Sequence, residues 1–313
     1  MRIAVLGAGA MGCLFGGALA RCGHSVTMID VSKAQIEALS KNGITLTTDE
    51  GHFQIPVTAG FASEIKGPFE LLILFTKGMH SNAALSSVKH LLTGDIRVLS
   101  LQNGIGHQEI IEKYVAARQI IVGMTGYPAD TVEPGKVKSH GSSHTAIVDA
   151  NGEISGFTLA LGEEITKAGL NCKVSKDVFK DIWEKVAFNA AANCTTTLTQ
   201  LSIGDFMGVG LGRELIYEIA KETVAVANAK NIPAAFENVK KMLDHVAVAQ
   251  YGHKSSMLQD YLAKRQTEVE FINGAIVRAA RAVRLDAPYN FAAYALISTL
   301  QNTYQNRCQP VQE

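Results

Sequence analysis

The chain has 313 residues, and 47% of them are hydrophobic, which is enough to bury the cores of two domains. Its 29 Lys and Arg residues balance 29 Asp and Glu residues, so no strong field of either sign would hold it to nucleic acid or to an anionic membrane. Small molecules are therefore the expected partners. Outside the glycine-interrupted start of the chain, no apolar run approaches the roughly 18 residues that span a bilayer.

The cysteines indicate a reducing compartment. They are odd in number, widely scattered and free of C-x-x-C spacing, which argues against a disulfide framework and against a zinc site. We therefore expect a cytoplasmic protein without a bound metal. The five positions are Cys13, Cys22, Cys172, Cys194 and Cys308.

The first 150 or so residues alternate short β-branched runs with amphipathic segments, the pattern of a parallel sheet covered by helices. Residues 44–51 and 53–57 alternate at period two around an acidic turn and predict an inserted antiparallel hairpin. A second ribbon is predicted from 135 to 148. The predicted strands of the main sheet are 2–6, 26–30, 71–75, 98–101 and 120–124.

After about Lys176 the strand signals stop, and apolar residues recur at i, i+3, i+4 and i+7. The predicted fold class is therefore α/β, with a Rossmann-type doubly wound sheet over 1–174 and an all-α domain over 175–313. An apolar segment at 291–297 could form a homodimer interface. The predicted helices cover 178–200, 211–230, 233–249, 266–284 and 288–304, with breaks at Pro233 and Pro288.

A glycine-rich motif directly follows the first predicted strand and opens a helix, which is the context of a dinucleotide fingerprint. The first glycine permits the tight turn, the second lets the backbone approach the diphosphate, and the third allows close packing of helix on sheet. The phosphate would lie on the positive helix N-terminus. The predicted cofactor-binding residues of this motif are Gly7, Ala8, Gly9, Ala10, Met11 and Gly12.

Asp30 lies at the end of the second predicted strand, 18 positions after Gly12. A carboxylate there accepts hydrogen bonds from a ribose 2′-OH and repels a 2′-phosphate, so NAD(H) is favoured while NADP(H) stays possible. Ser32 and Lys33 are near enough to supply compensating contacts. Alternatively, Asp30 only caps the following helix.

Two more polar segments follow later strands: Thr76 with Lys77, and Asn103 with Gly104. The carboxyl edge of a doubly wound sheet is where ligands bind, so Thr76, Lys77 and Asn103 are candidates for cofactor contacts. As alternatives, Asn103-Gly104 is a plain turn and Lys77 a surface lysine with a buried stem.

Near the middle of the chain, Lys185, Asn189 and Asn193 recur every four residues. Steps of four drift only about 40° on a helix, so the three side chains share one edge. Asparagine is a poor helix former, and two of them beside a lysine indicate a specific hydrogen-bonding task. The alternative is a set of ordinary buried polar contacts.

A third cluster covers 253–260 and 266–274. By pattern alone it is a serine-capped helix, a short connector and another capped helix with Glu268 near its start.

Because of these segments, the chain resembles the ketopantoate reductase (2-dehydropantoate 2-reductase) family, from Met1 to about residue 305. The resemblance rests on residues 2–12, Asn103-Gly104, Trp183 with the Lys185 series, and the segments 255–260 and 267–274. It implies a cytoplasmic oxidoreductase of pantothenate biosynthesis that uses NAD(P)H. Lys185 would donate a proton to the ketone oxygen and Glu268 would assist it. Substrate would be held by Asn189, Asn193, Ser256 and His253, with Asn103 near the nicotinamide and the substrate.

Three departures from the family pattern fall at the predicted site. Asp30 and its neighbours lack the basic residue that NADPH-preferring members of the family usually place near this strand end. Asn193-Cys194-Thr195 replaces the usual Asn-Pro-Leu, and His253 replaces a common asparagine. An NAD-dependent D-2-hydroxyacid dehydrogenase of mandelate type is therefore the alternative function. A β-hydroxyacid dehydrogenase is less favoured because its G-x-x-G-x-x-x-K run is missing, and a non-catalytic NAD sensor is the remaining alternative.

Overall fold

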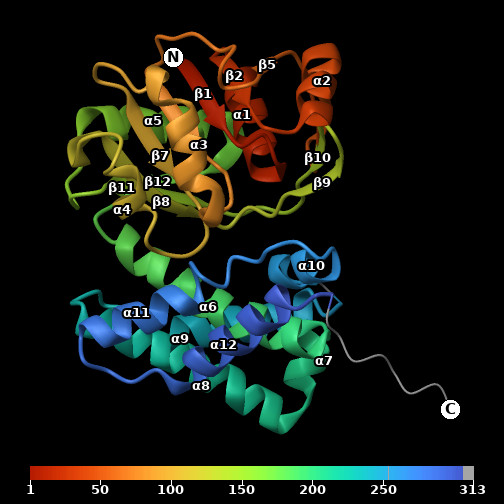
Figure 1. Cartoon of the computed structure of the whole chain (residues 1–313), viewed down its shortest axis with the longest axis vertical. Helices are drawn as coiled ribbons and strands as arrows, with labels where there is room; N and C mark the ends of the chain where they lie inside the picture. Colours follow the sequence, from red (N-terminus) through yellow and green to blue (C-terminus); the bar gives the residue numbers. More distant parts are fainter. Residues whose placement is uncertain (253, 306–313) are drawn as a thin grey trace, which may run out of the picture. The chain divides into compact units, whose positions relative to one another are not determined.

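The computed structural model describes residues 1–252 and 254–305. They form two compact units: residues 1–102 with 106–178, and residues 103–105 with those from 179 onward. The first unit contains the strands, and the second is helical (Figure 1). The predicted boundary at 174/175 concerns domains that fold separately, and it stays a prediction.

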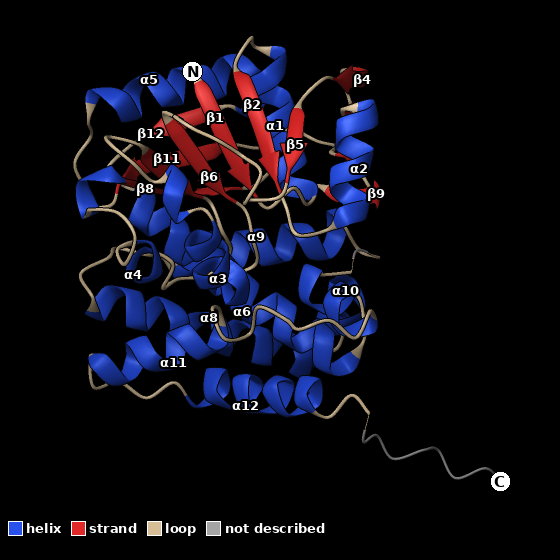
Figure 2. Cartoon of the chain, turned by 45° about the horizontal axis from the view of Figure 1, so that its top comes forward, coloured by secondary structure: helices blue, strands red, loops and turns tan. Residues whose placement is uncertain are grey.

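The main sheet of the first unit has eight strands in the order β12-β11-β8-β7-β6-β1-β2-β5. Strand β1 pairs in parallel with both β2 and β6, so the strand order reverses at β1 and creates the switch point at which such sheets bind ligands. Figure 2 shows β1, β2 and β5 as neighbouring arrows of common direction. The strands are β1 (Arg2–Leu6), β2 (Ser25–Ile29), β5 (Thr58–Gly60), β6 (Leu71–Leu74), β7 (Arg97–Ser100), β8 (Ile120–Thr125), β11 (Thr145–Asp149) and β12 (Cys172–Val174).

The five predicted strands of this sheet are confirmed, with ends shifted by one residue at most. Strand β6 shows why these strands could be recognised in the sequence: all four of its residues are apolar and fully buried. A parallel sheet is covered on both faces and therefore selects unbroken apolar runs. The helices of this unit are α1 (Ala10–Arg21), α2 (Lys33–Asn42), α3 (Ser81–Ser87), α4 (Gln108–Ile111) and α5 (Gly156–Ile165).

A second, four-stranded sheet has the order β4-β3-β10-β9. The predicted hairpin is confirmed, because β3 (Ile44–Thr48) pairs antiparallel with β4 (Gly51–Ile55). The second ribbon was predicted in the wrong place: it consists of β9 (Asp130–Glu133) and β10 (Lys136–Lys138). Strand β11, which was assigned to it, instead pairs antiparallel with β8 in the main sheet. All five β11 residues are buried, which requires a strand covered on both faces.

The second unit is helical, as predicted, and four of its five predicted helices are confirmed within three residues at each end. The exception is 266–284, because helix starts only at Asn273. The N–H and the hydroxyl of Thr267 both donate to Gln301 Oε1, at 3.0 and 2.8 Å, which ties this backbone to α12. The helices are α6 (Val178–Thr199), α7 (Ile203–Gly208), α8 (Gly210–Ala229), α9 (Phe236–Ala249), α10 (Ser256–Leu262), α11 (Asn273–Ala282) and α12 (Pro288–Asn302).

Within residues 1–252 and 254–305, no helix is both long and apolar enough to cross a membrane. Phe291 and Leu296 of α12 are 50% and 54% exposed, and a homodimer through this face stays a prediction.

The start of α12 is capped by a side chain from another helix. Ala287 precedes α12 and has no side-chain oxygen to offer. Instead, the Glu222 carboxylate of α8 accepts from the N–H groups of Tyr289 and Asn290, both at 2.9 Å, and from Asn290 Nδ2 at 2.9 Å. Glu222 thereby satisfies donors that a helix start leaves unpaired and places a negative charge at the positive helix end.

We predict that Glu222→Ala lowers the free energy of unfolding by about 1–3 kcal/mol, since it leaves the N–H groups of Tyr289 and Asn290 without their acceptor. Urea unfolding of the full chain measures this change. Glu218→Ala is the matched control on the same helix. Glu218 forms only a surface ion pair with Lys221, and its loss should cost less than about 0.5 kcal/mol. Equal costs for the two variants would contradict the capping role.

Candidate functional site

The loop between β1 and α1 carries the glycine motif. Gly7 has φ of +100°, and a Cβ on it would lie 2.7 Å from the Thr76 amide nitrogen. A Cβ on Gly12 would lie 2.0 Å from the Gly7 carbonyl oxygen, so the helix begins against the loop at a distance that only glycine permits. In contrast, a Cβ on Gly9 would meet no described atom within 4 Å. The outer glycines are required by the loop itself, whereas Gly9 faces open space.

The start of α1 fits the diphosphate of a dinucleotide. Gly9 caps the helix without a side chain, so the N–H groups of Ala10 and Met11 have no intrahelical acceptor. The open space at Gly9 lets a phosphate approach these donors, and the helix dipole adds positive potential. No acidic side chain lies in the first turn of α1 to oppose it.

Asp30 holds the glycine loop from the neighbouring strand. Its Oδ2 accepts from the Ala8 N–H at 2.7 Å, and its Oδ1 accepts from the Ser32 N–H at 2.8 Å. Ser32, not Asp30, caps α2, because Ser32 Oγ accepts from the Gln35 N–H at 3.3 Å. The Asp30 carboxylate therefore stands beside the loop as a fixed negative charge at the end of β2.

Gln35 was not singled out by sequence reasoning, yet it holds the same loop. Its side chain is 8% exposed, Nε2 donates to the Ala8 carbonyl at 2.6 Å, and Oε1 accepts from the Gly135 N–H at 3.0 Å. A glutamine shortly after a helix cap is ordinary on a surface helix. Only the tertiary contact with Gly135, which is distant in sequence, distinguishes Gln35 from such a surface glutamine.

The ends of β6 and β7 meet near the glycine loop. Gln102 Nε2 donates to the Thr76 carbonyl at 2.5 Å and to Ser81 Oγ at 2.7 Å. The structure thus brings Thr76 beside Gly7, as the carboxyl edge of a parallel sheet requires. Lys77 is partly buried in the same loop. Asn103, one residue beyond Gln102, belongs to the other unit.

In the helical unit, α6 carries Lys185, Asn189 and Asn193 on one edge. The asparagines are 8% and 5% exposed, and neither side chain has a hydrogen bond to any described residue. Neither amide is among the fully buried, unpaired polar atoms of the described residues, so both keep access to solvent or to a ligand that offers hydrogen-bond partners. Two such amides on one edge are suited to a polar substrate.

Lys185 is an unusual lysine because of its surroundings. Burial lowers the pKa of its ammonium from 10.5 to about 8, and the charge of Glu268 acts in the opposite direction. Its neighbours Val186 and Ala187 are 2% and 0% exposed, so the helix around it is embedded in the core. A pKa of about 8 suits a group that must hold and release a proton.

Asn273 fastens α6 to the neighbouring helices. It is fully buried, and its Nδ2 donates to the Ala190 carbonyl of α6 at 3.2 Å and to Asn290 Oδ1 at 3.0 Å. Asn290 is the residue bound by Glu222, so a polar chain runs from α8 through α12 and α11 to α6. This chain anchors the turn that follows Asn189.

The two serines at the start of α10 have different surroundings. Ser255 Oγ accepts from the Leu258 N–H at 3.3 Å and lies 2.8 Å from Thr196 Oγ1, so it caps α10 and links it to α6. Ser256, the predicted substrate contact, is exposed at the first helical position. His253 lies outside the described residues.

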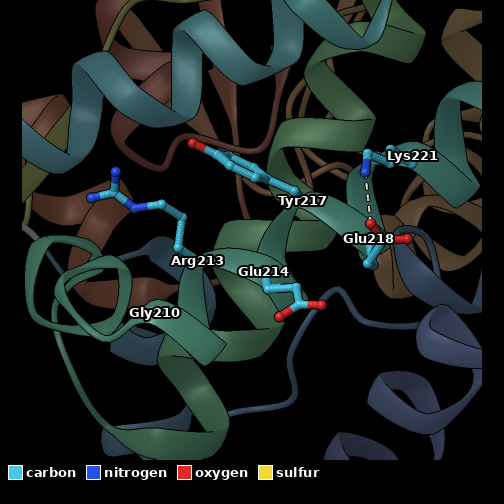
Figure 3. A pocket seen from close by; sticks show the side chains of 6 residues that line it. All are labelled: Gly210, Arg213, Glu214, Tyr217, Glu218 and Lys221. Atoms are coloured by element: carbon cyan, nitrogen blue, oxygen red, sulfur yellow. Dashed lines mark hydrogen bonds and ion pairs between the residues drawn. The ribbon is translucent and has the colours of Figure 1, made fainter.

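A surface pocket is lined by one helix alone (Figure 3). The two basic side chains that line it already have partners. Lys221 Nζ lies 2.7 Å from Glu218, and Arg213 Nε donates to the Met207 carbonyl at 3.1 Å. None of the predicted site residues lines it, and we assign it no function. Its lining residues, all on α8, are Gly210, Arg213, Glu214, Tyr217, Glu218 and Lys221. Among the described residues, no cluster of His, Cys, Asp and Glu could hold a metal ion.

Comparison with known proteins shows what this arrangement is similar to. Residues 3–152 match the family model "Ketopantoate reductase PanE/ApbA", and residues 177–301 match its C-terminal model. A Pyrococcus horikoshii protein named 2-dehydropantoate 2-reductase is 32% identical, over 96% of this chain and 98% of that protein. A Streptococcus pyogenes protein of the same name is 30% identical, over 92% and 94%.

Two solved structures extend the comparison. A ternary structure of D-mandelate dehydrogenase with NADH and anilino(oxo)acetate has a TM-score of 0.91 at 28% identity, covering 97% of this chain and 100% of that one. A PanE/ApbA family ketopantoate reductase from Ralstonia eutropha JMP134 has a TM-score of 0.89 at 27% identity, covering 98% and 100%. The two family models together match most of the sequence. The chain belongs to the ketopantoate reductase family.

Proposed function

We propose that this protein is an oxidoreductase that reduces 2-dehydropantoate, a 2-oxo acid, to the corresponding D-2-hydroxy acid with a nicotinamide cofactor. The observation that carries the proposal is the edge of α6, where two buried asparagine amides have no described partner beside a lysine of lowered pKa. The relatives named 2-dehydropantoate 2-reductase support the choice of substrate.

The residues divide the chemistry between them. A reduced nicotinamide, when bound, would supply the hydride for the carbonyl carbon. Lys185, as an ammonium, donates a proton to the carbonyl oxygen, and so the developing alkoxide becomes a hydroxyl. Glu268 stabilises the ammonium form electrostatically. Residues 7–12, with Asp30, Thr76 and Lys77, hold the dinucleotide.

The substrate is held by neutral hydrogen-bonding groups. Asn189, Asn193, Asn103 and Ser256 bind the carboxylate or hydroxyl of the 2-oxo acid without adding another titratable group beside the acid. The roles of these residues, and that of His253, are part of the proposal.

A second candidate is reduction of bulkier 2-oxo acids, as in a D-mandelate dehydrogenase. Two observations favour it: the TM-score of 0.91 to such an enzyme with NADH bound, and the fixed Asp30 carboxylate beside the glycine loop. Pocket shape, rather than the shared polar residues, decides between these substrates.

Replacing the proton donor should abolish turnover and spare cofactor binding. We expect Lys185→Met to lower kcat by at least about 100-fold, since general acid catalysis contributes that much or more. The dissociation constant for NADH, measured by fluorescence titration, should stay the same. Lys180→Met, on the same helix, is the control and should retain full activity. Full activity of Lys185→Met would remove lysine from the mechanism.

The pKa of Lys185 near 8 sets the pH dependence. Reduction needs the ammonium, so kcat/KM for the 2-oxo acid should fall about tenfold per pH unit above pH 8. Oxidation of the hydroxy acid needs the neutral amine and should rise with pH until it levels off above 8. The residual activity of Lys185→Met should show neither change. A wild-type profile that is flat from pH 7 to about 9.5 would contradict the assignment.

Cofactor and substrate preference are measured together, by steady-state reduction of 2-dehydropantoate, phenylglyoxylate and a branched 2-oxo acid with NADH and with NADPH. We expect 2-dehydropantoate and NADH to be preferred. Asp30→Asn should lower the NADH:NADPH ratio of kcat/KM about tenfold or more, because it removes the charge that repels a 2′-phosphate.

Asparagine keeps one acceptor oxygen, so this variant loses only one of the two hydrogen bonds that Asp30 accepts, from Ala8 or from Ser32. That loss should affect both cofactors alike, so the ratio isolates the effect of the charge. An unchanged ratio would assign the preference to other residues. Preference for phenylglyoxylate would favour the mandelate-type function, and cofactor binding without turnover of any 2-oxo acid would favour a sensor.

A further inference from the structure

Residues 103–105 are the only part of the chain before residue 179 that groups with the helical unit. The Ile105 N–H donates to the Phe271 carbonyl at 3.0 Å, and the Ile105 side chain packs against the hydrophobic core of the helical unit. The loop that carries Asn103 is therefore attached to the segment 266–272.

Gly104 makes this attachment possible. It has φ of +94°, and a Cβ on it would lie 2.2 Å from the Phe271 carbonyl oxygen and 2.8 Å from the carbonyl carbon. The obstructing atoms belong to the backbone and have no rotamer by which to move aside. We call this close approach, together with the Ile105 hydrogen bond, the Gly104–Phe271 clasp.

The partner side of the clasp is itself fixed. The Phe271 N–H donates to the Glu268 carbonyl at 3.0 Å, so Phe271 and Glu268 belong to one turn. Thr267, at the start of that turn, is 1% exposed and is held by Gln301 through both its N–H and its hydroxyl. The clasp thus fastens the loop of Asn103 to the turn that presents Glu268.

We propose that Gly104 is a positioning residue for the reaction: through the clasp it holds the Asn103 amide in register with Glu268, and hence with Lys185. This inference rests on the proposed function. Its physical basis is that a polar group displaced by about 1 Å can cost 100-fold in rate, and that the residues next to Asn103 contact the backbone of the Glu268 turn directly.

The test compares Gly104→Ala with Gly106→Ala. Gly106 has nearly the same φ, +95°, but a Cβ on it would meet no described atom within 4 Å. Both variants place alanine in the left-handed region, and only Gly104→Ala breaks the clasp. We expect Gly104→Ala to lower kcat/KM for the 2-oxo acid about 100-fold relative to Gly106→Ala. The dissociation constant for NADH should change less than about threefold in either variant, because the residues proposed to hold the dinucleotide, 7–12 with Asp30, Thr76 and Lys77, are untouched.

A double-mutant cycle separates positioning from general damage. If Gly104 acts through Asn103, Gly104→Ala should cost less than about threefold in an Asn103→Ala background. A further loss of about 100-fold in that background would overturn the proposal, and so would equal losses in Gly104→Ala and Gly106→Ala.

Amide hydrogen exchange tests the clasp independently of activity. The Ile105 amide should be protected in the wild type and in Gly106→Ala, and should exchange faster in Gly104→Ala. Fast exchange of Ile105 in the wild type would overturn the clasp even if Gly104→Ala does not fold. If the wild type reduces no 2-oxo acid, the proposed function fails while the exchange result still decides whether the clasp exists.

Discussion

In each unit, a glycine lets one backbone segment lie closer to another than a Cβ would allow, and the position of the predicted site residues depends on that contact. In the nucleotide-binding unit, Gly7 lies against Thr76 and Gly12 against Gly7, and this contact sets the direction in which α1 begins. Asp30 and Gln35 then hold Ala8 by its N–H and its carbonyl. The N–H groups at the start of α1 are therefore oriented before any ligand binds. Donors that are already oriented lose less conformational entropy when the ligand binds.

The helical unit is organised around α6, a helix that carries polar side chains where a core usually has apolar ones. Helix α6 is lined by buried alanines, yet it places Lys185, Asn189 and Asn193 along one edge. Polar groups at such positions lower stability unless something pairs with them. Violations of this kind are expected at functional sites, where stability is given up for chemistry. The polar chain through Asn273 and Asn290 connects α6 to α8, α11 and α12.

Sequence reasoning was wrong where contacts between distant segments override local preference. Residues 266–272 have the composition of a helix start, but the bond between Thr267 and Gln301 holds them in turns. Residues 145–148 were assigned to the second ribbon, but they are buried on both faces and lie in the main sheet. Gln35 could not have been found at all, because its partner Gly135 lies 100 residues away.

The sequence by itself determined the elements whose signal is local. The strands, the hairpin, most helices and the spacing of Lys185, Asn189 and Asn193 follow from side-chain periodicity, which neighbouring residues establish. Only the tertiary structure decided which residues surround these groups. The lowered pKa of Lys185, the bonds that occupy Asp30, and the placement of Asn103 with Glu268 depend on burial and on distances between segments far apart in the chain. Periodicity carries no information about those distances, because they arise only when the units fold.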